Sequence, residues 1–206
     1  MLNIINIQSN EARELINKQG LTLTAEQLNQ SRPSLDVRRQ VSHALVRSAL
    51  SHIPDIQIDR HESGRPYLTS HQNPDMLPLI SISHSGHWVA VMLSSPESLV
   101  TIDVEDMTLP RAHQKIIDHY FCESEKILIE TEGLIGFYKV WTAKEAIAKN
   151  LDKTISSLLS IDIGNNLKNR PLDEPFSLNY LDHNVSLTQS IPKNTPTLMI
   201  TVCERC

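Results

Sequence analysis

The sequence predicts an α+β protein made of two similar halves, each a helix packed on a small antiparallel sheet. A helical pattern followed by strand-like segments occurs at 36–93 and again at 137–202, without a strict sequence repeat. The chain has 206 residues and 40% hydrophobic content, which is enough to bury one large core or two smaller ones. We place the halves at 1–98 and 99–206 and expect a pseudo-twofold relation between them.

Charge and composition exclude several classes of protein. The formal net charge of −5 argues against a general nucleic-acid binder, which is usually basic. The opening residues lack the positive charge, long apolar run and cleavage site of a signal peptide, and no apolar run approaches the roughly 20 residues of a membrane span. We therefore expect neither a nucleic-acid partner nor a membrane partner.

The three cysteines, Cys122, Cys203 and Cys206, are too few and too unevenly spaced for a disulfide framework. This favours a cytoplasmic location. Cys203 and Cys206 form a C-x-x-C pair, but a structural zinc site needs a second pair of ligands, and none is apparent at a suitable spacing. We interpret the cysteines as ordinary reduced thiols, with zinc as the alternative.

The first half opens with an apolar, strand-like run and a short helix from Glu11. A turn at 31–36 then provides a cap for a helix that reaches about His52. One face of this helix is predicted to be buried, because its small and apolar residues recur at three- and four-residue spacing. These residues are Val37, Val41, Ala44, Leu45 and Ser48.

The cations of this region are nearly all arginines. Between Lys18 and Lys115 every basic residue other than histidine is one, and the set is Arg32, Arg38, Arg39, Arg47, Arg60, Arg65 and Arg111. A guanidinium presents a rigid fork of donors that matches phosphate oxygens, whereas an ammonium acts as a point charge. The bias favours phosphate binding; the alternative is a solvated helix face with ordinary ion pairs.

Two turns of the first half carry candidate ligand-binding residues. In 61–67, Gly64 can adopt positive φ and Pro66 fixes the exit, which holds Arg65 on a stiff loop. The segment 77–93 predicts a hairpin with Ser-His-Ser-Gly at its bend, where Ser83 and His84 could hold a phosphate or a ribose hydroxyl.

A serine beside a histidine could also indicate a hydrolase nucleophile. Adjacent residues of an extended chain point to opposite faces, however, and the sequence lacks the G-x-S-x-G elbow. Both facts argue against acyl hydrolysis.

The central motif is the acidic strand Ile102-Asp103-Val104-Glu105. Alternation along a strand directs Ile102 and Val104 into a core and Asp103 and Glu105 together to the other face. Paired carboxylates with no histidine or cysteine between them suit Mg²⁺, which completes its coordination with waters and substrate phosphates. The alternative is an amphipathic strand with one solvated face.

A helix with an interruption near 121–124 is predicted for 111–132, and a second helix for 137–151. In the second helix Val140, Ile147 and Leu151 form the core stripe. Trp141, Glu145 and Lys149 follow at i, i+4 and i+8 on a neighbouring face, so Glu145 could aim at the cation and Lys149 at a phosphate.

The alternative for this stripe is a surface Glu to Lys pair worth about 0.2–0.5 kcal/mol. After the helix, short apolar runs at 160–163, 176–178 and 197–202 are predicted to be antiparallel strands that cover it.

Taken in order, four motifs resemble those of the 4′-phosphopantetheinyl transferases: Gly64-Arg-Pro66, Ile82-Ser-His-Ser-Gly86, Ile102-Asp-Val-Glu105 and Trp141-x-x-Lys144-Glu145-Ala146-x-x-Lys149. The resemblance covers roughly residues 36 to 150 and is strongest to the two-halved, surfactin-synthetase-type branch. It implies the fold of that family and a monomer, because two fused halves supply an interface that shorter relatives obtain by association.

The resemblance also implies an activity: transfer of the phosphopantetheine arm of coenzyme A to a serine of an acyl or peptidyl carrier protein, with release of adenosine 3′,5′-bisphosphate. Asp103, Glu105 and Glu145 would hold Mg²⁺. Glu145 would also be the base for the carrier serine, directly or through a metal-bound water, while Lys144 would stand beside the reacting centre. Lys149 would reach the pyrophosphate.

The remaining coenzyme A contacts implied by the resemblance come from the first half. Arg65, Ser83 and His84 would bind the 3′-phosphate end, and Arg38 would be a further phosphate contact. The chain departs from the family at Thr101, where glycine is usual, so we expect a tighter backbone there. The N-terminal basic residues of the family have no clear counterpart, which leaves Lys18 and Arg32 as candidates.

Two other functions compete with this one. A catalytically silent carrier-binding relative would keep the fold without the transfer, although the intact set of carboxylates argues against it. A Mg²⁺-dependent phosphohydrolase would release phosphate without any carrier. For carrier docking we predict a cationic patch that includes some of Arg38, Arg39, Arg47 and Arg111.

Overall fold

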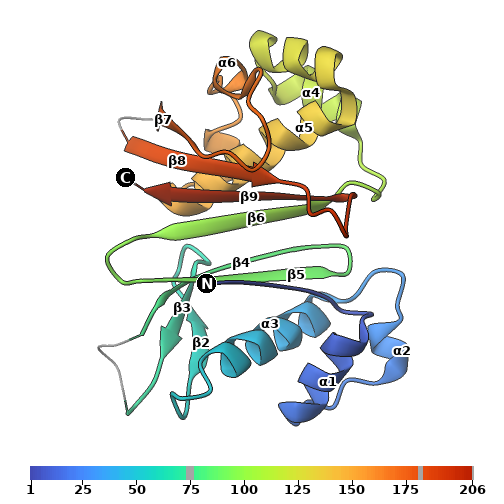
Figure 1. Ribbon diagram of the computed structural model, residues 1–206, viewed down its shortest axis with the longest axis vertical. Coiled ribbons are helices and arrows are strands. Elements are labelled where there is room, and N and C mark those ends of the chain that lie inside the picture. Colours follow the sequence, from blue (N-terminus) through green and yellow to red (C-terminus); the bar gives the residue numbers. More distant parts are fainter. Residues whose placement is uncertain (73–76, 181–182, 206) are drawn as a thin grey trace. The chain divides into compact units, whose positions relative to one another are not determined.

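The computed structural model describes residues 1–72, 77–180 and 183–205, and the chain divides into two compact units, Met1–Val100 and Thr101–Cys206. Each unit combines helices with antiparallel strands, which confirms the mixed helix and sheet composition predicted from the sequence (Figure 1). Within the described residues no helix has the length and apolar character that a membrane span requires.

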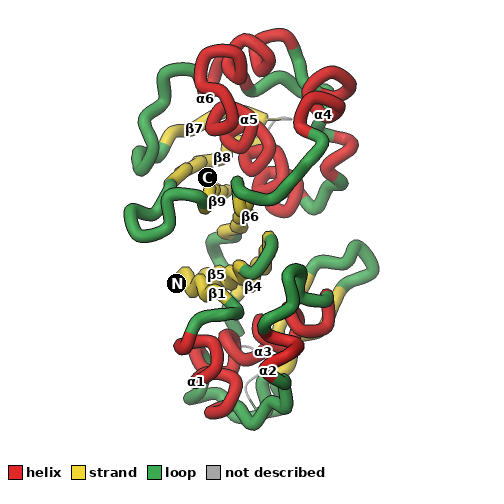
Figure 2. The backbone as a smooth tube through the Cα atoms, turned by 90° about the vertical axis from the view of Figure 1, so that its right-hand side faces the viewer, coloured by secondary structure: helices red, strands yellow, loops and turns green. Residues whose placement is uncertain are grey.

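The N-terminal unit contains two small sheets. Strand β5 (Trp88–Ser94) lies between β1 (Leu2–Asn6) and β4 (Leu79–Ser85), with both pairings antiparallel. A separate antiparallel hairpin joins β2 (Gln57–Arg60) to β3 (Pro66–Thr69). The helices are α1 (Asn10–Lys18), α2 (Ala25–Leu28) and α3 (Leu35–Ala49), and Figure 2 shows them on one side of the β1-β5-β4 sheet.

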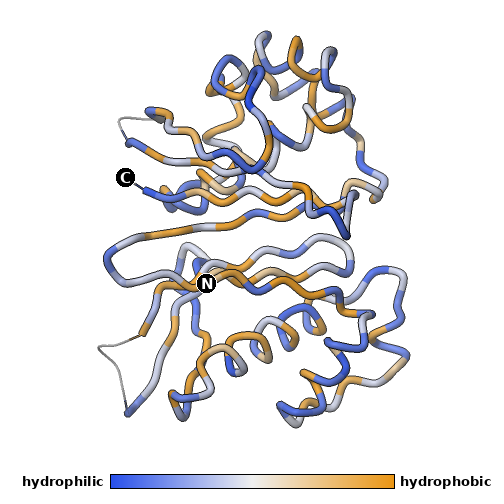
Figure 3. The backbone as a smooth tube through the Cα atoms, viewed as in Figure 1, coloured by the Kyte–Doolittle hydropathy of each residue, from blue (hydrophilic) through white to orange (hydrophobic). Residues whose placement is uncertain are grey.

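Helix α3 forms because a capped start and an apolar stripe coincide. The Ser34 hydroxyl accepts a hydrogen bond from the backbone N–H of Val37, which satisfies one of the free donors of the first turn. The predicted stripe is buried at Val37, Val41, Ala44 and Leu45 and half-buried at Ser48. Polar and apolar residues alternate along the helix in Figure 3, and the stripe packs on the core that β5 supplies.

Both predicted turns of this unit are present, with one difference in the second. Gly64 has φ of +87°, so it adopts the left-handed conformation expected for the 61–67 turn. In the β4–β5 hairpin Ser85 pairs with Trp88, and the bend therefore consists of Gly86 and His87. Ser83 and His84 lie inside β4, not at the bend, because the strand pairing continues past them.

The C-terminal unit is a four-stranded sheet with helices over it. The sheet order is β6 (Val100–Asp106), β9 (Leu198–Arg205), β8 (His183–Ser190), β7 (Phe176–Tyr180), and β7, β8 and β9 pair antiparallel. The helices are α4 (His113–Tyr120), α5 (Glu123–Leu151), η2 (Ile155–Ser157) and α6 (Gly164–Leu167). Cys203 is buried in β9, whereas Cys206 of the C-x-x-C pair lies outside the described residues.

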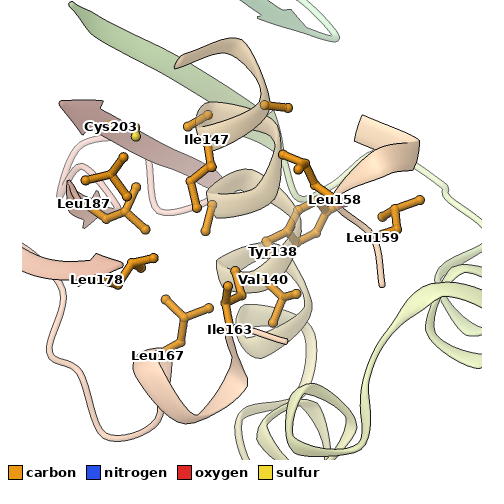
Figure 4. Close-up of a cluster of buried hydrophobic side chains, with 14 of the residues drawn as sticks. Tyr138, Val140, Ile147, Leu158, Leu159, Ile163, Leu167, Leu178, Leu187 and Cys203 are labelled. Atoms are coloured by element: carbon orange, nitrogen blue, oxygen red, sulfur yellow. The ribbon is translucent and has the colours of Figure 1, made fainter. Parts of the chain in front are cut away.

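Helix α5 unites segments that the sequence separates. The interruption predicted near 121–124 falls between α4 and α5, and a second break lies at Gly133, whose φ of 62° and ψ of −136° are not helical. Beyond Gly133 the predicted core stripe of Val140, Ile147 and Leu151 is buried. Figure 4 shows Val140 and Ile147 in a cluster with side chains from α6 and the sheet.

The prediction of a strand at 160–163 is wrong. These residues form a turn that leads into α6. The physical reason is that the backbone N–H of Ile163 donates to Oε1 of the buried Glu125 (3.0 Å), so a side chain provides the partner that a neighbouring strand would otherwise supply. The apolar side chain of Ile163 joins the core, which explains the strand-like pattern.

Candidate active site

Strand β6 presents two carboxylates whose environment differs from a solvated face. Ile102 and Val104 are buried. Asp103 and Glu105 are also buried, with exposed fractions of 4% and 8%. Burial of two charged groups is costly unless cations or hydrogen bonds compensate, so the alternative of a simple amphipathic strand is excluded.

The polar stripe of α5 lies against this strand. Nζ of Lys149 is 2.8 Å from Oδ1 of Asp103 and donates to the Ile102 carbonyl (3.1 Å), and the indole N–H of Trp141 donates to Oε1 of Glu105 (2.9 Å). The Thr101 hydroxyl donates to the Ala146 carbonyl (2.8 Å), a second link between β6 and α5. The threonine that departs from the family pattern thus helps to hold the strand on the helix.

Glu145 is close enough to Asp103 and Glu105 to interact with both electrostatically. The pKa of Glu145 is raised from 4.5 to about 7, first by burial and then by Asp103 and Glu105, while Lys149 and Arg111 oppose the rise. Mutual repulsion of this kind identifies carboxylates that share a small space. Glu145 therefore faces β6 from the α5 stripe, together with Trp141 and Lys149 on the turns before and after it.

This donor set fits a magnesium ion by its chemistry. All three groups offer hard oxygen ligands, and a cation would relieve the repulsion that raises the pKa of Glu145. In residues 1–72, 77–180 and 183–205, however, no three acidic, histidine or cysteine side chains form a ready-made cation cage. Asp103 and Glu105 are instead paired with Lys149 and Arg111, so a metal would have to compete with these two residues.

Arg111 is a site residue whose place the sequence did not reveal. It lies in the short connection from β6 to α4, and its Nη2 is 2.6 Å from Oε1 of Glu105. Its guanidinium carbon also stands 5.2 Å from the centre of the Trp141 ring and 5.9 Å from that of Tyr138. The signal that could have found it is its spacing of six residues from Glu105 across a connection too short to carry it far.

Lys144 does not accompany the other motif residues. Its side chain is fully buried, and its ammonium lies 2.8 and 2.9 Å from the two oxygens of Glu125 and donates to the Leu159 carbonyl (2.7 Å). Lys144 and Glu145 are consecutive on α5, so their side chains leave the helix about 100° apart. The expected position of Lys144 beside the reacting centre is therefore corrected to a buried ion pair behind it.

In the N-terminal unit the structure brings together two of the four predicted coenzyme A contacts. Nη1 of Arg38 on α3 lies 3.3 Å from Nδ1 of His84 on β4. Nε of Arg38 is buried without a hydrogen-bond partner among the described residues. The pKa of Arg38 is lowered, mainly by burial and to a smaller extent by the positive charge of Arg32. Ser83 is buried and, by strand alternation, lies on the opposite face of β4 from His84.

Arg65 lines a separate cavity of the same unit. The cavity has a volume of about 360 Å³ and is bounded by the β2–β3 turn and the start of β4, including Pro66, Tyr67 and Pro78. Ligand sites of small molecules commonly have volumes of about 300–1,000 Å³. The position of Arg65 at this cavity is compatible with a phosphate contact.

The exposed arginines of α3 form a second cationic feature. Arg39 and Arg47 are exposed one turn before and after His43. Burial, followed by Arg47, Arg60 and Arg39, lowers the pKa of His43, which shows that these cations are close in space. We call Arg39, His43, Arg47 and Arg60 the α3 cationic face.

Comparison with known proteins is consistent with this site. Residues 99–194, which contain every residue of the β6–α5 site, match the family model described as "4′-phosphopantetheinyl transferase superfamily". The chain is 34% identical over 99 residues to a Haemophilus influenzae protein provisionally named as a 4′-phosphopantetheinyl transferase, which covers 46% of this chain and 40% of that protein.

It is also 31% identical over 124 residues to the 4′-phosphopantetheinyl transferase AcpT of Escherichia coli, covering 58% of this chain and 60% of AcpT. The AcpT of Salmonella typhimurium is 29% identical over 123 residues, with coverage of 57% and 60%. The chain thus matches about 40 to 60% of the length of these relatives.

Proposed function

We propose that the chain is a member of the 4′-phosphopantetheinyl transferase superfamily, whose model matches residues 99–194, and that it transfers the phosphopantetheine arm of coenzyme A to a serine of an apo carrier protein. The observation that carries the proposal is the convergence of Asp103, Glu105, Glu145 and Lys149 on facing sides of β6 and α5. Two buried carboxylates with a third that interacts with them suit a magnesium ion, and phosphoryl transfer relies on such positioning and charge neutralisation.

In the proposed reaction the carrier serine oxygen attacks the phosphorus that bears the pantetheine arm. The bond from this phosphorus to the bridging oxygen of the pyrophosphate breaks, and adenosine 3′,5′-bisphosphate leaves with the bridging oxygen. The serine proton passes to Glu145. A carboxylate whose pKa is about 7 is suited to accept a proton near neutral pH. Bound Mg²⁺, held by Asp103, Glu105 and Glu145, would supply neutralisation of the pyrophosphate charge.

Lys149 would provide a second positive charge at this site, beside that of Mg²⁺. It is at once a partner of Asp103 and 30% exposed at its side chain, so its ammonium can contact a substrate phosphate while remaining close to the carboxylates. Positioning and charge neutralisation are the main contributions that a protein makes to phosphoryl transfer. Lys144 is assigned no contact with substrate, because its ammonium is held by Glu125.

The coenzyme A contacts of the N-terminal unit divide into two groups. Arg38 and His84 form one, and the unsatisfied Nε of Arg38 offers a donor for a phosphate oxygen. Arg65 and its cavity form the other. Ser83 remains a proposed contact on the opposite face of β4. We further propose the two-halved, surfactin-synthetase-type branch, a pseudo-twofold monomer and a cytoplasmic location.

Mass spectrometry of carrier proteins tests the proposal. A panel of apo carriers of the fatty-acid, polyketide and peptide types is incubated with the protein, coenzyme A and Mg²⁺, beside a sample with chelator. We expect one carrier serine to gain the mass of one phosphopantetheine arm, and the gain to vanish with chelator. The rates rank the carriers.

The same samples separate the two competing functions. Coenzyme A binding without any mass gain on any carrier would replace the proposal with a silent carrier-binding relative. Release of inorganic phosphate in the absence of carrier would replace it with a phosphohydrolase.

A further inference from the structure

One oxygen of Glu105 is already saturated by donors from the protein. Oε1 accepts from Nη2 of Arg111 at 2.6 Å and from the indole N–H of Trp141 at 2.9 Å. A carboxylate oxygen has two lone pairs for such contacts, so both are in use. For this oxygen to bind a metal ion, one of the two donors has to leave.

The two donors differ in how easily they can move. Trp141 belongs to α5, and its ring is stacked parallel to that of Phe137, with 6.2 Å between centroids and 7° between planes. Arg111 belongs to the connection between β6 and α4, outside any helix or strand, and its side chain is 24% exposed. The guanidinium can therefore leave by side-chain rotation, whereas the indole would have to give up its stacking with Phe137.

The surroundings of Arg111 support the guanidinium even without Glu105. The rings of Trp141 and Tyr138 lie 5.2 and 5.9 Å from its central carbon, a separation at which aromatic faces attract cations. A guanidinium held beside the rings of Trp141 and Tyr138 still has N–H donors with which to bind a phosphate group bidentately.

We propose that Arg111 is an internal cation that occupies Glu105 in the substrate-free protein and turns to a substrate phosphate when a divalent cation binds the carboxylates. The inference deepens the proposed function, on which it rests for the metal and the phosphorylated substrate. It assigns Arg111 two alternating partners of negative charge, and it makes Arg111 a substrate-contacting residue that none of the four sequence motifs contains.

A definite sign of coupling follows. Arg111 and the metal compete for Glu105, so loss of the guanidinium must strengthen metal binding in the substrate-free protein. Loss of the same guanidinium must weaken binding of a phosphorylated substrate once metal is present. A merely structural arginine would move neither affinity, or would weaken both through damage to the site.

The first test is calorimetric titration of Mg²⁺ into the substrate-free protein. We expect Arg111→Gln to bind Mg²⁺ about tenfold more tightly than the unaltered protein, a factor that corresponds to about 1.4 kcal/mol. Arg111→Lys, which keeps the charge but not the fork, should fall between the two and guards against a folding defect of the glutamine variant. Equal or weaker binding of Mg²⁺ by Arg111→Gln overturns the inference.

Arg170→Gln is the matched control. Arg170 lies in the same unit and also stands over an aromatic ring, 5.4 Å from the centre of Phe176, and its Nε donates to the Asn166 carbonyl. The substitution removes the same charge from a site without the Glu105 contact. Its Mg²⁺ affinity should equal that of the unaltered protein; a gain as large as that of Arg111→Gln would mean that net charge alone is responsible, and would also overturn the inference.

The second test is titration of coenzyme A at saturating Mg²⁺. Arg111→Gln should bind coenzyme A about tenfold more weakly, in opposition to its effect on Mg²⁺. The two titrations test different claims. If the unaltered protein binds no coenzyme A, the proposed function fails, while the Mg²⁺ titration still decides the competition. If it binds coenzyme A and Arg111→Gln does so equally well, the transfer of Arg111 to phosphate is disproved.

Discussion

Asp103 and Glu105, two buried carboxylates of β6, are each paired with a cation. Asp103 is paired with Lys149 from α5, and Glu105 with Arg111 from the following connection. Glu145 has acidic neighbours on both sides, and burial together with these neighbours raises its pKa to about 7. The neutral form of Glu145 is therefore well tolerated by the fold, whereas the charges of Asp103 and Glu105 are stabilised by their partners.

This difference predicts distinct effects of two substitutions. Glu145→Gln should lower the transfer rate at least a hundredfold and leave the thermal unfolding temperature nearly unchanged, because a neutral isostere replaces a group that the fold accepts as neutral. Asp103→Ala should also abolish transfer and leave the fold intact, but it should lower the unfolding temperature by a few degrees, because Lys149 loses its partner.

The measurements are carrier modification by mass spectrometry and thermal unfolding by circular dichroism. The control for both measurements is Ser156→Ala on η2, which is remote from the carboxylates in the sequence and whose hydroxyl contacts that of Thr154. Near-normal transfer in either carboxylate variant would refute the assignment of these residues.

At the scale of elements, the ion pair between Lys144 and Glu125 fixes the second part of α5 to the first. Both side chains are fully buried, and Glu125 also accepts from the backbone N–H groups of Cys122 and Ile163. The pair spans the non-helical Gly133, so it joins the two straight parts of the helix and the turn before α6. It thereby sets the rotation of α5 that directs Glu145 toward β6.

Breaking this pair should destabilise the protein strongly. We expect Lys144→Met to lower the free energy of unfolding by about 3–5 kcal/mol, because Glu125 is left as a buried charge without its cation. Urea denaturation measures the effect. The double variant Lys144→Met/Glu125→Met removes both charges and should recover much of the loss; a double variant as unstable as the single one would show that apolar packing, not charge, dominates there.

At the scale of the whole molecule, positive charge gathers on one helix although the net charge of the chain is negative. The chain carries a net −5, yet α3 presents Arg39 and Arg47 with no ion pair to any described residue. Of the arginines predicted for carrier docking, Arg38 lies beside His84 and Arg111 is paired with Glu105. The α3 cationic face therefore provides the cations that remain accessible to a carrier protein. An acidic protein surface is a suitable partner for it.

Charge reversal on this face tests carrier docking. Arg39→Glu/Arg47→Glu should raise KM for an acidic carrier several-fold with little change of kcat, because association and not chemistry is weakened. The effect should diminish at high ionic strength. Lys168→Glu, which reverses an exposed charge in the C-terminal unit, is the control. Unchanged carrier kinetics in the double variant would mean that docking is mainly apolar or lies elsewhere.

Local patterns account for much of the structure. The buried stripe of α5 and the capped amphipathic pattern of α3 each follow from residue spacing, and the structure contains both. Burial does not alternate along β6, because residues of α5 cover Asp103 and Glu105. The strand expected at 160–163 failed because its apolar pattern serves a turn whose backbone donor is satisfied by Glu125. Periodicity cannot show that a distant side chain will replace a strand partner.

The sequence alone determined which side chains share a face: the paired carboxylates on one strand, and a Glu and a Lys one turn apart on a helix, because the periods of strand and helix fix this. Only the tertiary structure decided which of the adjacent residues Lys144 and Glu145 enters the core and which faces β6. It also decided that Arg111 and Lys149 neutralise the carboxylates. Such pairings depend on the distance between elements in space, and spacing along the chain does not specify that distance.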